Sequence, residues 1–384
     1  MSLCVLVAAV EASGDALGAE LMEALRRKLG GGVRFVGVGG PLMVKQGLAS
    51  AFDIRELSVL GLVDGLMAYR RASRRAKQLT ALAERERPDV AVLIDSWGFS
   101  YLTARRLRRA LPGLKLVKYV APQVWASRPR RAEALAKTFD LLLSIVPFEA
   151  SIFEKAGARV ISLAYPGVTR DLTLADPVRL RRRIGAAKDD QVLLILPGSR
   201  PAELRRMLGP FRDAARMLKA ERPSLQVVIG AAPTVAEEIR TAAAAWPFRA
   251  HVIEDPTGRD DAMAAADVAL ACSGTIAVEL AAAGCPMVVA YRLGPVTYAI
   301  AKRIVRTRYI TLFNIAADAL VAPELIQKDC TAPRLAAELA LRLDDPALRK
   351  RQAAAQRQAV ESLGRGRSPT ADAAAQAIAA LIGR

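Results

Sequence analysis

The sequence predicts an α/β protein made of two doubly wound domains that face each other across a cleft. Three observations support this prediction. The chain has 384 residues, which is too long for one ordinary core and fits two domains of similar size. Hydrophobic residues make up 52% of it, enough to fill both cores and to exclude a disordered chain. Short apolar runs alternate with stretches of helical periodicity, as in repeated βαβ units.

The first domain is expected over residues 1–168. Its predicted strands are continuous apolar runs, typical of a parallel sheet covered on both faces. They are Leu3–Val10, Val33–Val38, Val90–Ile94, Leu116–Val120, Leu141–Val146 and Val160–Leu163. Leucines spaced four residues apart, from Leu17 to Leu29, predict a helix after the first strand. Turn or polar residues follow the strands, at the end where open α/β sheets bind ligands.

The second domain is expected over residues 169–367, after a linker at Pro166–Leu174. It repeats the alternation, with predicted strands at Val192–Leu196, Gln226–Ile229, Val252–Ile253, Val268–Ala271 and Met287–Tyr291. From Ala332 onward the pattern is helical. Ser368 and Pro369 supply a cap and a first turn for a last helix over residues 368–383. This helix is a candidate for packing back on the first domain.

The net charge and the residue composition limit the classes of molecule that the protein is expected to bind. Lysine and arginine number 56 against 38 acidic residues, a net charge of +18, which favours nucleotides or an acidic membrane surface. Nucleic acid is disfavoured because aromatic residues make up only 5% and do not interleave with the basic clusters. The four cysteines show no metal-ligand spacing, which predicts buried thiols of a cytoplasmic protein. The chain has a single histidine, His251. We expect no metal, no cofactor and no histidine triad.

One apolar segment, Leu57–Ala68, breaks the alternation. Basic residues follow it directly, at Arg70, Arg71, Arg74, Arg75 and Lys77. A membrane-surface helix needs an apolar face with a basic flank, but a buried helix with cations in its last turn has the same pattern. No apolar run reaches the ~20 residues that span a bilayer. The net charge favours the membrane-surface interpretation, which predicts a cytoplasmic protein that lies against a membrane.

The strand Val192–Leu196 leads into a candidate phosphate site. Its turn consists of Pro197, Gly198, Ser199 and Arg200, and a helix opens at Pro201 with Glu203 in its first turn. A strand, a glycine turn and a helix start direct free N–H groups at one point, and the arginine adds a bidentate charge. An ordinary strand-to-helix corner with a surface arginine has the same residues.

A second turn of this kind follows the strand Val268–Ala271. It consists of Ser273, Gly274 and Thr275, and Glu279 lies one turn into the next helix. Hydroxyl and N–H groups at a helix start suit a diphosphate, and such a carboxylate can accept from ribose hydroxyls. The alternative is helix capping. Together, the two turns predict one nucleotide diphosphate held by two loops.

Carboxylates follow two strands of the first domain. Glu11, Ser13 and Asp15 come after the first strand, and Asp95 comes after Val90–Ile94. Ser13 and Asp15 can be explained as caps of the next helix, whereas Glu11 has no such explanation. Because histidine is scarce, acid–base chemistry here falls to carboxylates.

Six motifs occur in order over nearly the whole chain. They are Glu11–Asp15, Tyr119 with Pro122–Ala126, Pro147–Glu149, Leu196–Arg200 with Glu203, Ser273–Thr275 with Glu279, and Pro323–Leu325 with Gln327. The most specific is the Pro-Gln-Val-Trp-Ala run that begins at Pro122. The series resembles the lipid-A-disaccharide synthase family, which are inverting glycosyltransferases with two Rossmann-like domains, the GT-B fold.

The resemblance implies that 2,3-diacylglucosamine is transferred from UDP to 2,3-diacylglucosamine 1-phosphate, giving a β-1,6-linked lipid A precursor and UDP. The donor would bind the two loops of the second domain, with Asn314 and Gln327. The acceptor and its lipid would bind the first domain, at Ser13, Asp15, Leu60, Leu62, Gln123 and Trp125. Asp95, Glu11 and Arg200 are then the catalytic candidates. Anionic inner-membrane lipids and a second copy in a homodimer are the further implied partners.

The chain departs from the family pattern at a proposed catalytic acid. Gly98 stands there, within the run Asp95–Ser100, so that Asp95 or Glu11 is the candidate base. Two alternatives remain open. One is a UDP-sugar 2-epimerase-like isomerase, whose usual acid–base residues include histidine. The other is a non-catalytic UDP-sugar-binding homologue, which Gly98 favours.

Overall fold

Two six-stranded parallel sheets organise the chain in the computed structural model, which describes residues 3–58, 65–126, 129–169, 172–305 and 307–384. Each sheet belongs to its own compact unit. Unit 1 comprises Met1–Pro166 with Arg367–Arg384, and unit 2 comprises Gly167–Gly366. The predicted fold class of two doubly wound α/β domains is confirmed.

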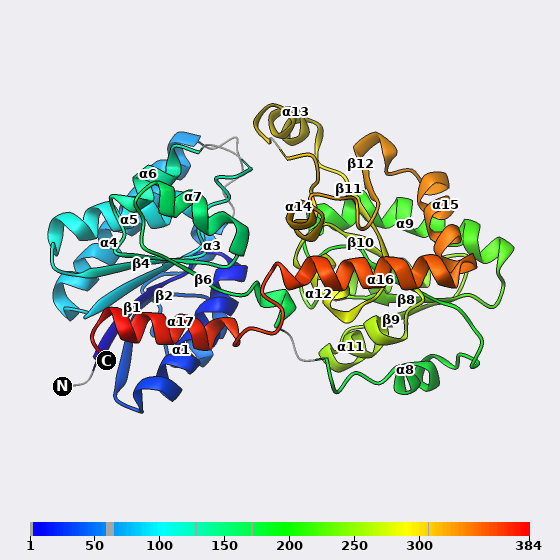
Figure 1. Ribbon diagram of the computed structural model, residues 1–384, viewed down its shortest axis with the longest axis horizontal. Coiled ribbons are helices and arrows are strands. Elements are labelled where there is room, and N and C mark those ends of the chain that lie inside the picture. The colour runs from blue at the N-terminus through cyan, green and yellow to red at the C-terminus, as the bar shows by residue number, and fades with distance from the viewer. Residues whose placement is uncertain (1–2, 59–64, 127–128, 170–171, 306) are drawn as a thin grey trace. The chain divides into compact units, whose positions relative to one another are not determined.

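The sheet of unit 1 has the strand order β2-β1-β3-β4-β5-β6, with every pair parallel (Figure 1). Its strands are β1 (Leu3–Ala8), β2 (Val33–Val38), β3 (Val90–Ile94), β4 (Lys115–Tyr119), β5 (Leu141–Ser144) and β6 (Val160–Ser162). Its helices are α1 (Ala12–Leu29), α2 (Pro41–Lys45), α3 (Arg55–Ser58), α4 (Gly65–Glu86), α5 (Trp97–Ala110), α6 (Arg131–Ala136), η1 (Pro147–Glu149), α7 (Ala150–Lys155) and α17 (Thr370–Leu381). All five residues of β3 are buried, which explains its continuous apolar run.

The sheet of unit 2 has the order β12-β11-β10-β7-β8-β9, again all parallel. Its strands are β7 (Val192–Leu196), β8 (Gln226–Gly230), β9 (Ala250–Ile253), β10 (Val268–Cys272), β11 (Met287–Tyr291) and β12 (Glu324–Ile326). Its helices are η2 (Pro166–Val168, at the border), α8 (Pro177–Ile184), α9 (Pro201–Glu221), α10 (Ala236–Ala244), α11 (Pro256–Ala265), α12 (Thr275–Ala283), α13 (Pro295–Ile304), α14 (Leu312–Ala317), η3 (Gln327–Asp329), α15 (Ala332–Asp344) and α16 (Pro346–Glu361). One core cluster joins β7, β8 and β10 to α9, α10 and α15.

Each sheet has a point where the chain reverses its direction across the strands. In unit 1 this point lies between β1 and β3, and in unit 2 between β7 and β10. The strand ends are in register there, because Ala8 pairs with Leu93 and Leu196 pairs with Ala271. The loops after each pair therefore lie side by side, at the position where open α/β sheets bind ligands.

The last helix, α17, packs on α1, so that the C-terminal segment lies against the first helix of unit 1 (Figure 1). Arg27 on α1 forms an ion pair of 2.6 Å with Asp372. Thr370 donates from its hydroxyl to the carbonyl of Ala164 at 3.0 Å. The helix begins at Thr370, two residues later than predicted, because Pro369 has the extended dihedrals of a helix cap.

Several predicted strand bounds need correction. The strands predicted at Leu3–Val10 and Leu141–Val146 end two residues earlier, at Ala8 and Ser144. The residues beyond these ends are buried without continuing the strand, so apolar character alone does not mark where the ladder stops. The three-residue strand β12 was not predicted, because so short a run has no periodicity to detect.

The cysteines lie as predicted. All four cysteines are free and buried, and His251 lies on β9, the edge strand of its sheet. Within the part of the chain that the structure describes, no helix has the length and apolar character needed to cross a bilayer.

Candidate functional site

The turn after β7 is built around Gly198. Its φ of +110° lies in the region that favours glycine, and an added Cβ would lie 2.9 Å from Oε2 of Glu203. Arg200 is the extended N-cap residue of α9, and Pro201 occupies the first helical turn. The turn thus opens directly into the N-terminus of a 21-residue helix, whose free N–H groups favour an anion.

Glu203 connects this turn to the neighbouring strand. Its Oε1 accepts from the Tyr291 hydroxyl at 3.0 Å and pairs with Nη1 of Arg200 at 3.1 Å. Burial, with Glu203 beside it, raises the pKa of Tyr291 to about 12, so this hydroxyl stays a donor. The Glu203 side chain is 13% exposed and that of Arg200 is 75% exposed. A bound phosphate would therefore compete with a single carboxylate for an accessible guanidinium.

The turn after β10 lies beside the first one. Gly274 has a φ of +147° and is the N-cap residue of α12, which begins at Thr275. An added Cβ at Gly274 would meet no heavy atom within 4 Å, so the space before this helix is open. Ser273 and Glu279 are half-buried on either side of the helix start. The structure thus brings the two predicted phosphate turns together at the reversal point of unit 2.

In unit 1, Asp95 lies at the corresponding reversal point. Asp95 and Ser96 have φ values of +50° and +36°, an uncommon backbone for residues other than glycine. The hydroxyl of Ser13 donates to Oδ2 of Asp95 at 3.1 Å, and the hydroxyl of Ser100 donates to its carbonyl at 2.7 Å. The loop after β1 and the loop after β3 thus present one hydroxyl and one carboxylate together.

Beneath this turn lies Lys118, which the sequence did not single out. It is on β4, only 1% exposed, and its Nζ donates to the carbonyl of Asp95, to that of Leu93 at 3.3 Å, and to Oγ of Ser100 at 3.3 Å. Burial lowers the pKa of Lys118 to about 7, while the carboxylates of Asp95 and Glu11 oppose this shift. A lysine inside a predicted apolar strand was the available signal, since lysine is almost never fully buried without a partner.

Trp125 contacts Glu149, a buried carboxylic acid that was not among the predicted site residues. Its indole N–H donates to Oε2 of Glu149 at 2.8 Å, and Ser144 donates to Oε1 at 2.7 Å. Glu149 is 1% exposed, and burial raises its pKa to about 7. The ring of Trp125 also packs edge-on against Phe148 at 5.3 Å. These contacts hold the Pro122–Ala126 motif against the Pro147–Glu149 motif.

Two predicted site residues have their polar groups occupied by the scaffold. Asp15 is buried and accepts from the backbone N–H groups of Gly40, Leu42 and Met43 at 2.8–3.0 Å, which caps α2 rather than its own helix. Asn314 is fully buried, and its amide bonds to the backbone at Val321 and Ala322 and to Glu324. Their described contacts give both residues a structural role.

The remaining predicted residues lie as follows. Glu11 is the N-cap residue of α1, beside the Asp95 turn, and Gln123 is exposed. Gln327, at a φ of +53°, accepts from the N–H of Leu293 at 2.8 Å. Gly98 is exposed in the first turn of α5, where an added Cβ would meet no heavy atom within 4 Å. Leu60 and Leu62 lie outside the described residues.

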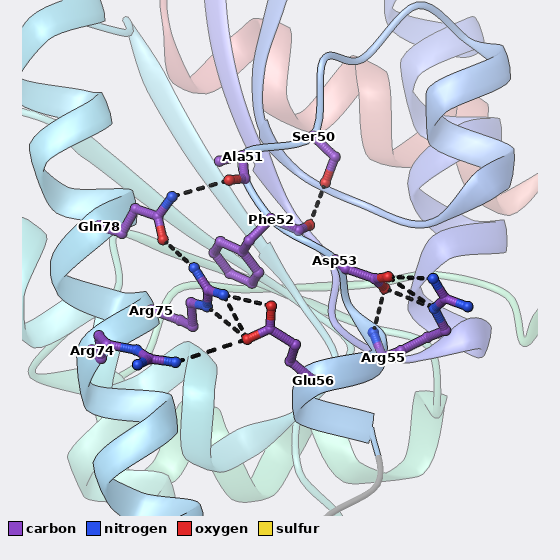
Figure 2. Close-up of polar contacts among 9 residues, drawn as sticks. All are labelled: Ser50, Ala51, Phe52, Asp53, Arg55, Glu56, Arg74, Arg75 and Gln78. Carbon is purple, nitrogen blue, oxygen red and sulfur yellow. Dashed lines mark hydrogen bonds and ion pairs between the residues drawn. The ribbon is translucent and has the colours of Figure 1, made fainter.

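Two of the basic residues that follow the Leu57–Ala68 segment form ion pairs within unit 1. Figure 2 shows Glu56 of α3 facing Arg74 and Arg75 of α4, at 3.9 and 2.5 Å. The Arg75 guanidinium also lies over the Phe52 ring at 4.9 Å. Arg70, Arg71 and Lys77 are exposed on the same helix. The exposed cations, rather than Arg75, are thus available to an external anionic surface.

Within the ranges that the structure describes, no three His, Cys, Asp or Glu side chains are arranged to hold a metal ion. The arginine and the two helix starts of unit 2 are instead the groups suited to neutralise a diphosphate.

Sequence comparisons identify relatives over nearly the full length. The family model described as lipid-A-disaccharide synthetase matches residues 5–378. The chain is 41% identical over 380 residues to the lipid-A-disaccharide synthase of Rhodospirillum centenum, covering 99% of this chain and 95% of that one. It is 42% identical over 384 residues to that of Ruegeria pomeroyi, covering 97% and 94%.

Solved structures with the same fold include MurG of Acinetobacter baumannii, with a TM-score of 0.59, 16% identity and 99% of each chain covered. A UDP-GlcNAc 2-epimerase of Neisseria meningitidis bound to UDP-GlcNAc has a TM-score of 0.58, 11% identity and coverage of 100% and 99%. At these identities the likeness shows the fold alone.

Proposed function

Since the chain belongs to the lipid-A-disaccharide synthase family and is a glycosyltransferase of GT-B fold, we propose that it transfers 2,3-diacylglucosamine from UDP to 2,3-diacylglucosamine 1-phosphate with inversion. The observation that carries the proposal is the pair of adjacent glycine turns at Gly198 and Gly274, each opening into a helix. Two such turns suit one diphosphate.

On the donor side, departure of UDP needs neutralisation of the growing negative charge. Arg200 and the N–H groups of the two helix starts supply it without a metal, as preorganised donors do in other enzymes. Glu279, one turn into α12, would accept from the ribose hydroxyls. Glu203 would hold Arg200 in place by its ion pair until the diphosphate binds and forms an ion pair with the same guanidinium.

On the acceptor side, a carboxylate must take the proton of the attacking hydroxyl. Asp95 is the candidate base, because its carboxylate lies at the reversal point of unit 1 and is oriented by Ser13 at 3.1 Å. Glu11 is the alternative base on the neighbouring loop. Gly98 contributes no acid, so the reaction here depends on these residues.

Release of UDP tests the function as a whole. The enzyme is incubated with UDP-diacylglucosamine, with and without 2,3-diacylglucosamine 1-phosphate. UDP released only with the acceptor supports the transferase, and formation of the disaccharide, followed by mass spectrometry, identifies the product. Release or isomerisation without acceptor would contradict it.

Arg200→Ala tests the donor site. Loss of one preorganised donor to the leaving group should lower kcat by roughly hundredfold to thousandfold. Arg216→Ala, an exposed arginine further along α9, is the matched control and should leave kcat unchanged. Near-normal turnover of Arg200→Ala at saturating donor would remove this arginine from the mechanism.

Glu279→Ala tests the ribose contact. It should raise the KM for the donor by roughly tenfold, the cost of a lost hydrogen bond to a charged group, with a smaller effect on the KM for the acceptor. An unchanged donor KM would refute this role.

We also propose that the protein binds the anionic inner face of the membrane through the Leu57–Ala68 segment and the exposed cations of α4. Flotation with phosphatidylglycerol vesicles should fall for Leu62→Glu and at high salt. Equal flotation of both proteins would contradict this.

We further propose that the protein forms a homodimer. Sedimentation equilibrium tests this, because a single species of 41.1 kDa would exclude the dimer.

A second candidate function, a non-catalytic UDP-sugar-binding protein, is favoured by Gly98 alone. It predicts UDP binding without acceptor-dependent release, so the same assay separates it from the transferase. The epimerase-like alternative lacks support from acid–base residues, because the only histidine, His251, lies on the edge strand β9.

A further inference from the structure

The turn that carries Asp95 has an uncommon backbone at two consecutive residues. Asp95 and Ser96 both adopt a positive φ, +50° and +36°, in the left-handed region that side-chain-bearing residues rarely occupy. Such a backbone persists only where the surrounding structure holds it, and it is concentrated at functional sites. The contacts that hold this turn therefore decide where the Asp95 carboxylate points.

Strand β4 holds both peptide groups of Asp95. The N–H of Asp95 donates to the carbonyl of Tyr119 at 2.9 Å. The carbonyl of Asp95 accepts from Nζ of Lys118. Strand pairing places the lysine for this contact, because Lys118 lies opposite Leu93 in the ladder of β3 and β4, two residues before Asp95. The turn is thus fastened to the neighbouring strand on both sides of the Asp95 side chain.

The amino group of Lys118 also joins the turn to the helix that follows it. Nζ donates to the carbonyl of Leu93 and to Oγ of Ser100, each at 3.3 Å, and Ser100 itself donates to the carbonyl of Asp95 at 2.7 Å. Lys118 and Ser100 are each only 1% exposed. The Asp95 carbonyl therefore accepts from two buried donors, while its half-buried carboxylate accepts from the hydroxyl of Ser13 at 3.1 Å.

A lysine is an unfavourable residue for this position in the sheet. Strand β4 is an interior strand, and an apolar side chain would fill the place without the desolvation of an amino group. Burial lowers the pKa of Lys118 to about 7, and the carboxylates of Asp95 and Glu11 on the two adjacent loops oppose this shift. The amino group keeps N–H donors in both protonation states. Stability of the sheet does not explain the lysine, whereas its contacts with the Asp95 turn do.

We propose that Lys118 is a positioning residue, which holds the Asp95 turn so that the carboxylate can take the proton of the acceptor hydroxyl. The proposal rests on the proposed function and on Asp95 as its base. Without the amino group, Asp95 and Ser96 can relax toward an ordinary backbone, and the carboxylate moves with them. A displacement of about 1 Å is enough to lower a rate by roughly hundredfold.

Kinetics of Lys118→Met test the proposal, because methionine keeps the apolar part of the side chain and removes the amino group. We expect kcat to fall by roughly tenfold to hundredfold. The donor KM should change by less than about threefold, since the lost hydrogen bonds lie in unit 1 and the donor is proposed to bind unit 2. Lys115→Met is the matched control, because Lys115 is exposed at the start of the same strand, and it should leave both constants unchanged.

Ser100→Ala tests the same contact with the lysine in place. It removes the other buried donor to the Asp95 carbonyl and should lower kcat by roughly threefold to tenfold, the effect of one hydrogen bond. Circular dichroism shows whether each variant is folded.

A double-mutant cycle with Asp95→Asn separates positioning from a general loss of stability. If Lys118 acts through Asp95, adding Lys118→Met to Asp95→Asn should lower kcat by less than about threefold further, because residues that act as a unit are not additive. A loss of stability would instead lower the rate by the same factor in both backgrounds.

The outcomes distinguish this role from the proposed function. If wild type releases no UDP with acceptor, the proposed function fails and the positioning role fails with it. If wild type is active, an unchanged kcat in folded Lys118→Met, its full effect in the Asp95→Asn background, or a retained rate in Asp95→Asn overturns the positioning role alone. If Lys118→Met does not fold, Ser100→Ala decides: a lowered kcat that the Asp95→Asn background abolishes supports the role, and an unchanged kcat overturns it.

Discussion

Replacing Lys118 by methionine should make the stability of unit 1 less dependent on pH. In the native structure, burial lowers the pKa of Lys118 from 10.5 to about 7. The unfolded chain keeps its proton up to about pH 10.5, so between these values it binds more protons than the native state does. The wild type therefore becomes more stable as pH rises through this window, and is penalised most below pH 7.

The size of the effect follows from this pKa difference. Between the two pKa values, the free energy of unfolding rises by about 1.4 kcal/mol for each pH unit. The rise is smaller just above pH 7, because native Lys118 is only half deprotonated there. From pH 7 to pH 9 the wild type should gain about 2 kcal/mol relative to Lys118→Met. The variant also loses the donor to the carbonyls of Leu93 and Asp95, which costs about 1–3 kcal/mol at every pH.

Urea unfolding at pH 7, 8 and 9 measures this difference. A Trp246→Phe background leaves only Trp97 and Trp125, both in unit 1, to report by fluorescence. Glu149, whose pKa is also about 7, is present in both proteins and cancels in the comparison. Lys77→Met, an exposed lysine of α4, controls for the lost charge. A gap between wild type and Lys118→Met that stays constant from pH 7 to 9 would refute the reasoning.

Three further predictions concern unit 1. Gly37→Ala should destabilise it by more than about 3 kcal/mol in urea, because the new Cβ would lie 1.9 Å from the carbonyl oxygen of Val7 at a φ of +135°; wild-type stability would contradict this. Asp95→Asn should lower kcat by roughly hundredfold or more if Asp95 is the base, and a retained rate would shift that role to Glu11. Gly98→Asp should leave the Tm within a few degrees, since the site is open, and a large drop would contradict the description of that helix start.

Much of the fold could be predicted because its determinants are local. Buried parallel strands are continuous apolar runs, as at Val192–Leu196, and this pattern predicts where the strands lie. The structure confirms the two-sheet architecture. The ends of strands were less accurate, as at Val10 and Val146, because apolar loop residues continue the pattern after the ladder stops. Strand order could not be read from the pattern, since pairing is set by tertiary packing.

The glycine turns were recognisable for the same local reason. Gly198 and Gly274 each stand between an apolar strand and a helix, and both adopt the positive φ that glycine allows. The pairing of β7 with β10 brings the two turns side by side, which no local motif encodes.

The sequence by itself determined the two α/β domains, the phosphate-type turns and the family, because each depends on residue type and order along the chain. Only the tertiary structure decided which polar residues are occupied by the scaffold. Asp15 and Asn314 resemble ligand-binding residues in sequence, yet backbone groups of other segments satisfy them, at Gly40 for Asp15 and at Val321 for Asn314. In the sequence, Lys118 stands out only as a lysine within an apolar strand, because its burial and its carbonyl partners come from neighbouring strands.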